Sequence, residues 1–151
     1  MFFGEHRHTI DEKSRLTLPA KWREELEAGV FVTRGLEDCL FVFTKAKFEV
    51  IAQEIEQQGL ESADSRAWAR YLAGMAEPAD LDKQGRILIP QNLRDYAKLN
   101  GEVVIVGAIS RIEVWNPERH KENKAAIESN AAAVAERMAQ VMRRAAAPTN
   151  K

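Results

Sequence analysis

Two stretches of the chain follow one pattern: Asp11-Glu-Lys-Ser-Arg-Leu-Thr-Leu-Pro19 and Asp82-Lys-Gln-Gly-Arg-Ile-Leu-Ile-Pro90. In each, an aspartate and an arginine stand four positions apart, followed by two apolar residues separated by one position, and then by proline. With one inserted residue the correspondence continues through two later apolar runs, where Val42 corresponds to Val114. Agreement over this length at a nearly constant offset indicates an internal duplication.

Each copy predicts the same local structure of strand, polar turn, strand, short helix, strand and strand. Polar residues between two short apolar runs are typical of a tight hairpin. Gly85 supplies the left-handed residue that such turns require, and Ser14 at the same place would be less stable there by about 1 kcal/mol. We expect Asp11 and Asp82 to shape the turns by accepting backbone N–H groups.

The segments after the two prolines complete the repeat. Proline suits the first helical position, so short helices are predicted over residues 19–27 and 90–98. Runs rich in β-branched and aromatic residues predict strands over 30–33, 40–43, 103–106 and 112–115. A unit of about 40 residues is too small to bury an adequate core alone. We therefore expect both copies to share one core with pseudo-two-fold symmetry, which places the two turns equivalently.

Helices are predicted outside the repeats. Residues 48–55 and 68–75 carry apolar stripes at helical spacing, which are typical of packing surfaces. The C-terminal tail places apolar residues at alternating steps of four and three, a seam suited to packing on another helix; these are Ile127, Ala131, Val134, Met138 and Val141. Residues 145–151 are expected to fray.

Basic residues gather in sequence around both turns. Arg15 and Arg86 begin strands on the face opposite the apolar residues and should point away from the core. The first turn has Arg7, Lys13, Lys21 and Arg23 around it, and the second has Lys83 and Arg94. A guanidinium offers paired donors to guanine or phosphate, and a lysine offers a mobile phosphate contact. The chemistry alone leaves open a purely structural alternative, in which each arginine forms an exposed ion pair with its aspartate. Such a pair stabilises the fold by only about 0–1 kcal/mol.

Other reactive residues give weak signals. His6 and His8 share a strand face, but no further ligand stands at a recognisable spacing, so solvated histidines are favoured over a metal site. They could equally approach phosphate beside Arg7. The single cysteine, Cys39, lies in an apolar run and is expected to be buried. No catalytic motif, metal site, cofactor or small-molecule ligand is predicted, and an enzyme is not expected.

Composition agrees with one ordinary globular domain. The chain has 151 residues, of which 45% are hydrophobic and 30% charged. Its net charge of −1 gives no general attraction to a polyanion, so only a local basic patch could bind one. No apolar run is long enough for a membrane span, and no secretory signal is recognisable, so a cytoplasmic protein without a membrane partner is expected.

The paired Asp-x-x-x-Arg strings, together with the start Met1-Phe-Phe-Gly4, resemble the MraZ family of bacterial transcriptional regulators over residues 1 to 143 or so. The resemblance implies an α+β fold in which two tandem AbrB-like swapped-hairpin units share one pseudo-two-fold β-barrel core with peripheral helices. It places the units at residues 5–47 and 76–119. A C-terminal helix and frayed tail follow at 120–151.

The resemblance also implies a function. Such proteins are sequence-specific DNA-binding regulators, usually repressors, which form ring-shaped homo-oligomers and act on repeated sites upstream of the cell-division and cell-wall gene cluster, in association with the nucleoid. By position, Arg15 and Arg86 become the lead DNA contacts, followed by Lys13. Lys83 and Arg7 are further candidates because they lie beside the turns in sequence. The alternative is a protein-interaction or scaffold module of antitoxin-like fold.

The two motifs differ in detail. The family's first motif usually reads Asp-x-Lys-Gly-Arg, and this chain keeps Lys13 but has Ser14 in place of glycine. In the second motif Gln84 stands where lysine would match, with Lys83 one position earlier. Because basic residues are denser around the first turn, we expect that turn to carry more of the DNA binding.

Overall fold

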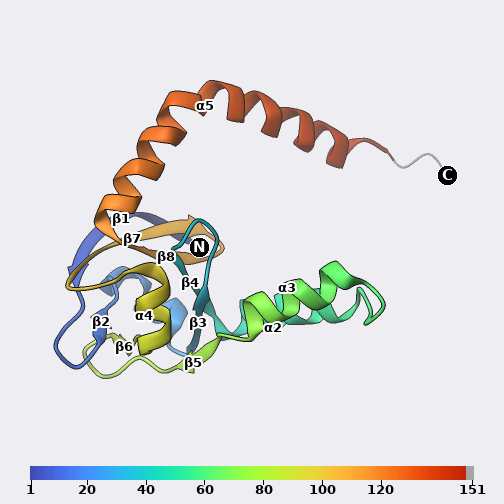
Figure 1. Cartoon of the computed structure of the whole chain (residues 1–151). Coiled ribbons are helices and arrows are strands. Elements are labelled where there is room, and N and C mark those ends of the chain that lie inside the picture. Colours follow the sequence, from blue (N-terminus) through green and yellow to red (C-terminus); the bar gives the residue numbers. More distant parts are fainter. Residues whose placement is uncertain (149–151) are drawn as a thin grey trace. The chain divides into compact units, whose positions relative to one another are not determined.

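A computed structural model describes residues 1–148 of the chain (Figure 1). Residues Met1–Pro117 form one compact unit, and the described residues from Glu118 onward belong to a second. The first unit contains every described strand and four of the five α-helices, so the mixed α+β class expected from the sequence is confirmed. None of the described helices is long and apolar enough to cross a bilayer.

A six-stranded antiparallel sheet dominates the first unit. Its order is β1-β7-β8-β4-β3-β5. The strands are β1 (Phe2–Thr9), β3 (Val30–Arg34), β4 (Leu40–Thr44), β5 (Glu77–Ala79), β7 (Glu102–Ile109) and β8 (Ile112–Trp115). The central pair, β4 and β8, comes from corresponding runs of the two repeats. Each edge strand pairs with the opposite repeat, β1 with β7 and β5 with β3, so neither repeat completes the sheet alone.

A second, two-stranded sheet joins the repeats again. Strands β2 (Arg15–Thr17) and β6 (Arg86–Leu88) are antiparallel, with Leu16 opposite Ile87. Side chains alternate along both strands, so Leu16 and Ile87 are buried while Leu88 is exposed. Both buried residues belong to one apolar cluster with residues of β3, β4, β7 and β8. The shared core expected from the small size of each repeat is therefore present.

The closed β-barrel implied by the resemblance is not formed. In the described residues the large sheet is open, with β1 and β5 at its edges, and β2 and β6 form a separate sheet. A single isolated bridge from Ile10 to Leu16 marks the transition from β1 to β2.

Short helices follow both motifs. Pro19 and Pro90 occupy the N-cap positions, one residue before the helical positions expected for them. After Pro19 the chain forms a 3-10 turn, η1 (Ala20–Trp22), and then α1 (Arg23–Leu26), while Pro90 precedes α4 (Gln91–Ala97). Trp22, Leu26 and Leu93 are buried, which anchors both segments to the core.

The two helices between the repeats cover a second apolar cluster. Helix α2 (Lys45–Glu56) and helix α3 (Ala63–Ala73) contact each other and lie beside β3 and β4. Phe48 of α2 stacks on Phe31 of β3 with ring centroids 4.4 Å apart, and Leu72 of α3 is buried in the same cluster. The predicted stripe of α2 therefore packs, as does Leu72 of the α3 stripe, whereas Trp68 is 38% exposed. Both helices lie away from the β2–β6 ribbon (Figure 1).

Helix α5 (Pro117–Ala146) runs through most of the second unit. It has no buried residue, and Ile127, Val134, Met138 and Val141 of the predicted seam are among its exposed apolar side chains. The frayed segment was expected to begin at residue 145, but α5 continues to Ala146; the expectation for residues 149–151 lies outside the described residues.

The ribbon offers a paired test of the shared core. Leu16 is fully buried and Leu88, on the partner strand, is 56% exposed. We expect Leu16→Ala to lower the free energy of unfolding by about 2–5 kcal/mol, because it removes methyl groups from a packed interior. Leu88→Ala serves as the control and should change it by less than about 0.5 kcal/mol. Urea denaturation followed by circular dichroism measures both, and equal effects would contradict the shared core.

Candidate nucleic-acid interface

Two turns of identical construction lie at the ends of the ribbon. In turn 1 (residues 11–14), Ser14 N donates to Asp11 O at 2.9 Å and Asp11 N donates to Arg15 O at 3.0 Å. Turn 2 (residues 82–85) has the same two bonds at the same distances, from Gly85 to Asp82 and from Asp82 to Arg86. Ser14 has φ 63° and Gly85 has φ 75°, so both adopt the left-handed conformation.

The aspartate of each turn organises its own backbone. Asp11 Oδ1 accepts hydrogen bonds from Lys13 N and Arg15 N, both at 2.9 Å. Asp82 Oδ1 accepts from Gln84 N and Arg86 N in the same way. The Arg15 backbone N–H is the main cause that lowers the pKa of Asp11, and the Arg86 N–H lowers the pKa of Asp82. Both carboxylates are therefore ionised at neutral pH and hold the turns in shape.

The second oxygen of each aspartate holds an arginine side chain. Arg15 Nε donates to Asp11 Oδ2 at 2.8 Å, and Arg86 Nε donates to Asp82 Oδ2 at 2.7 Å. The exposed ion pair that competed with DNA contact is thus formed in both turns. It uses one of the five donors of a guanidinium. The pair therefore fixes the direction of the guanidinium and leaves its other donors for a further acceptor.

Backbone hydrogen bonds tie each turn to the residue that follows the short strand of the other repeat. Leu18 N donates to Gly85 O and Ile89 N donates to Ser14 O, both at 2.9 Å. Arg86 Nη1 also lies 3.9 Å from Asp11 Oδ2 of the opposite turn. The side chains of Arg15 and Arg86 are 32% and 24% exposed. The sequence placed them in two separate motifs, and the structure brings them to one surface.

The basic surroundings of turn 1 differ from those expected. Arg7 pairs with Glu102 of β7 at 2.7 Å. Lys21 Nζ lies 5.6 Å from the centroid of the Trp22 ring. The third residue, Arg23, lies against Gly85 and therefore belongs to turn 2. Of these three, only Arg23 is shown to lie elsewhere, because the bond between Leu18 and Gly85 carries the segment after β2 across to the other repeat. The placement of Arg7 and Lys21 beside turn 1 stays a prediction.

Arg94, expected beside turn 2, is also elsewhere. Its Nε donates to Ile89 O at 3.0 Å, and its Nη2 donates to Gln91 Oε1 at 2.8 Å. Ile89 is the residue that bonds to Ser14 of turn 1. Because the repeats exchange segments, Arg23 and Arg94 each lie away from the turn that precedes them in sequence. Lys13 and Lys83, which lie within the turns themselves, are exposed at turns 1 and 2.

His6 is not the solvated histidine expected from the sequence. Its ring meets Trp22 edge-on, with centroids 5.2 Å apart, and its Nε2 is buried without a hydrogen-bond partner. Desolvation lowers the pKa of His6, with nearby Lys21 adding to the effect. The described residues contain no group of three or more side chains placed to hold a metal ion. His6 therefore acts as a packing residue.

Cys39 is buried, as expected, and its thiol donates to Leu36 O at 3.2 Å. Burial is the largest cause that raises the pKa of this thiol above its ordinary range, so it is protonated at neutral pH. A protonated, enclosed thiol is a poor nucleophile.

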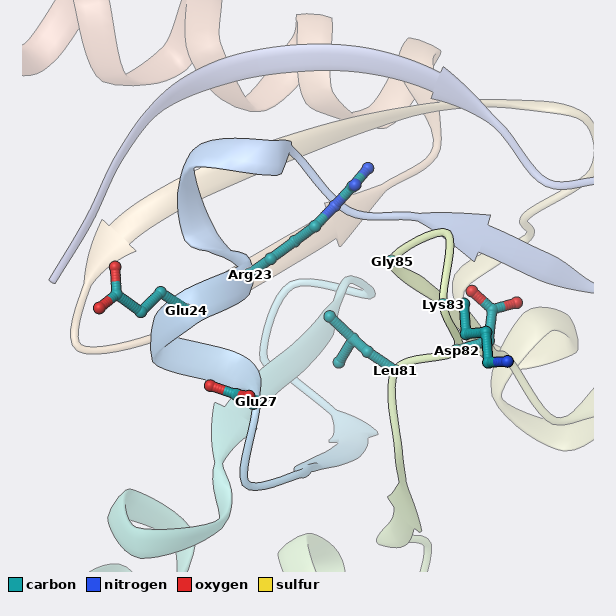
Figure 2. Close-up of a pocket in the computed structure, with 7 residues that line it drawn as sticks. All are labelled: Arg23, Glu24, Glu27, Leu81, Asp82, Lys83 and Gly85. Atoms are coloured by element: carbon teal, nitrogen blue, oxygen red, sulfur yellow. The ribbon is translucent and has the colours of Figure 1, made fainter.

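A cavity of about 320 Å³ opens beside turn 2 (Figure 2). Its lining consists of Arg23 and Glu24 from α1, of Glu27 just after α1, and of Leu81, Asp82, Lys83 and Gly85. Figure 2 shows the Arg23 side chain pointing away from Glu24 and Glu27, toward the Gly85 side of the cavity. Sequence reasoning missed this arrangement because the two walls are almost 60 residues apart in the chain.

The left-handed serine gives a direct test of the turn geometry. Ser14→Gly removes the steric cost of a Cβ at φ 63°, which is about 1 kcal/mol, while the added freedom of glycine in the unfolded chain offsets part of that gain. We expect the melting temperature to be unchanged or slightly raised, as measured by calorimetry. A clear fall would show that the Ser14 side chain stabilises the turn in another way.

The duplication in the sequence agrees with comparisons to known proteins. A family model described as "MraZ protein, putative antitoxin-like" matches the chain twice, at residues 1–71 and 72–142. A transcriptional regulator MraZ from Moorella thermoacetica is 43% identical over 138 residues, which cover 91% of this chain and 96% of the relative. The same-named protein of Carboxydothermus hydrogenoformans is 49% identical and covers 78% and 82%. That of Clostridium acetobutylicum is 38% identical and covers 93% and 99%. Both copies of the duplicated motif therefore lie within matched regions, and the chain belongs to the MraZ family.

Proposed function

We propose that this protein is a sequence-specific regulator of transcription that binds double-stranded DNA with its two joined turns. One observation carries the proposal: Arg15 and Arg86, from two separate motifs, lie on one surface and each is oriented through Nε by an aspartate. The names of the relatives, which are transcriptional regulators, support it. The proposal includes no catalytic step.

Each basic residue has a defined role in this proposal. The outer edge of an oriented guanidinium matches the paired acceptors O6 and N7 of guanine, or two phosphate oxygens. Exposed Lys13 and Lys83 contact phosphate. Arg7 remains a further phosphate contact, because its exposed pair with Glu102 stabilises by only about 0–1 kcal/mol and is easily exchanged.

The charges imply modest affinity for a single site. The chain has a net charge of −1, so no general field draws it to DNA. The few basic contacts of each subunit would give a salt dependence of roughly −0.9 in log–log slope for each neutralised phosphate. We therefore propose that several subunits act together.

The resemblance to family members supports the finer proposal. We propose two AbrB-like swapped-hairpin units in each chain, in agreement with the exchange of edge strands between repeats. Such chains would form a ring that engages repeated sites upstream of the cell-division and cell-wall gene cluster and represses it. The protein would then be cytoplasmic and associated with the nucleoid. Linking weak sites in this way raises apparent affinity by about 10²–10⁴ where the geometry permits simultaneous contact.

A second function rests on helix α5. Its exposed apolar residues form a seam at the spacing of a helix–helix contact. The family description as antitoxin-like is compatible with a protein-interaction module that works through this helix. In that case the turns would be a structural feature and α5 the functional surface.

The combined substitution Arg15→Ala and Arg86→Ala separates the two functions. We expect it to abolish specific DNA binding in a gel-shift assay, because it removes both oriented guanidinium groups, and to leave the oligomeric state measured by light scattering intact. Arg70→Ala, an exposed arginine on α3, is the control and should bind DNA normally. Undiminished binding by the double variant would instead favour the interaction module.

Avidity is tested by varying the number of sites on one duplex. The probe is a DNA site selected from a random library by the wild-type protein, presented either once or as spaced direct repeats. We expect the repeated probe to bind at least about 10²-fold more tightly, because neighbouring subunits engage it together. Equal affinity for the two probes would refute the joint action of subunits.

A further inference from the structure

Arg23 is an arginine without a partner in a region where the other arginines are paired. Among the described residues it forms no hydrogen bond or ion pair, and its Nε is buried without an acceptor. A buried donor left unsatisfied costs about 1–3 kcal/mol, and more when the group is charged. Arg15 and Arg86, by contrast, each donate Nε to an aspartate. The position of Arg23 therefore calls for an acceptor that the chain itself does not supply.

Gly85 determines where the Arg23 side chain lies. A Cβ added at Gly85 would lie 2.6 Å from Arg23 Cζ and 2.8 Å from Cδ, and it would overlap Nε. The guanidinium thus occupies the space that the missing side chain of Gly85 leaves open. The hydrogen bond from Leu18 to Gly85 explains why a residue of the first repeat reaches the second turn.

The other repeat shows what happens when that space is filled. Arg94 corresponds to Arg23, and Ser14 corresponds to Gly85. Ser14 has the same left-handed backbone but carries a Cβ. Arg94 is satisfied elsewhere, by Ile89 O and by Gln91. The repeats therefore differ at the left-handed turn position, which is serine in turn 1 and glycine in turn 2. They also differ in the helix arginine: Arg23 lies against Gly85, whereas Arg94 is hydrogen-bonded to Ile89 O and Gln91.

We propose that Arg23 is a further DNA-contacting residue, admitted to turn 2 by Gly85, and that Ser14 excludes Arg94 from the same role at turn 1. The inference rests on the proposed DNA-binding function and adds an asymmetry to it. Turn 2 then presents Arg86, Lys83 and Arg23, whereas turn 1 presents Arg15 and Lys13. The stronger half of the site is turn 2, the reverse of what the sequence predicts.

The chemistry favours a phosphate as the partner of Arg23. Phosphate oxygens satisfy a guanidinium through charge-assisted hydrogen bonds, and Lys83 lies on the same cavity wall as Gly85. The carboxylate of Asp82 is already occupied by Arg86 and two backbone N–H groups. Glu24 and Glu27 also line the cavity, but Arg23 points away from them (Figure 2). A phosphate beside turn 2 would therefore meet the basic side of the cavity.

Arg23→Gln, made in the full-length protein, tests the contact against the matched control Arg94→Gln. The probe is again the duplex selected by the wild-type protein. We expect Arg23→Gln to weaken binding roughly tenfold, the effect of losing one charge-assisted hydrogen bond. It should also reduce the log–log salt slope by about 0.9, since one phosphate contact is lost. Arg94→Gln should change neither quantity. Equal effects of the two variants would overturn the proposal.

Exchange of the turn residues tests the role of Gly85. Gly85→Ser copies into turn 2 the residue that turn 1 already accommodates at a positive φ. We expect it to reproduce the loss seen with Arg23→Gln and to add nothing when combined with that variant. Additive losses would show that Gly85 does not act through Arg23. Ser14→Gly should make binding sensitive to Arg94→Gln, and continued insensitivity would refute the exclusion by Ser14.

The double variant Arg15→Ala and Arg86→Ala distinguishes failure of the proposed function from failure of the proposed Arg23 contact. If it retains full DNA binding, the proposed function itself is wrong. If it abolishes binding while Arg23→Gln leaves affinity and salt slope unchanged, the proposed function stands and the role of Arg23 is refuted. Melting temperatures of all variants, measured alongside, identify any loss that comes from unfolding.

Discussion

The backbone hydrogen bonds from Leu18 to Gly85 and from Ile89 to Ser14 are the contacts on which the rest of the structure depends. They cross between the repeats, and together with the β2–β6 pairing they hold the two turns on one surface. Because the same exchange places β1 beside β7 and β5 beside β3, neither repeat has a complete sheet or core without the other. The duplication thus creates one site as well as one fold.

The aspartates resolve an apparent conflict between stability and binding. A carboxylate on the proposed DNA-binding surface would repel phosphate, yet Asp11 and Asp82 are central to their turns. One oxygen of each carboxylate accepts hydrogen bonds from two backbone N–H groups, and the other accepts one from an arginine Nε. Little of the carboxylate charge is therefore left uncompensated. The arginine side chain loses its conformational entropy during folding, so the guanidinium is already oriented when an acceptor binds.

The residues that form each turn could be predicted from sequence, but which residues of the two repeats lie together could not. The pattern Asp-x-x-x-Arg with alternating apolar residues identified both turns, the burial of Leu16 and Ile87, and the outward direction of the arginines, because these are properties of neighbours in one chain. The assignment of Arg23 to turn 1 was wrong, because Arg23 lies against Gly85 of turn 2. Proximity in sequence gave no information about a segment that crosses to the opposite repeat after Leu18. The closed barrel was also wrong, since strand order depends on pairings distant in sequence.

The sequence by itself determined the duplication, the α+β class, the left-handed residue of each turn and the burial pattern of the ribbon. Each of these follows from local backbone preference or from the period of two along a strand. Only the tertiary structure decided which turn each helix arginine accompanies. That outcome depends on the exchange of segments between the repeats and on one Cβ, which is present at Ser14 and absent at Gly85. Arg23 and a Cβ at position 85, 62 residues away in sequence, would compete for the same volume.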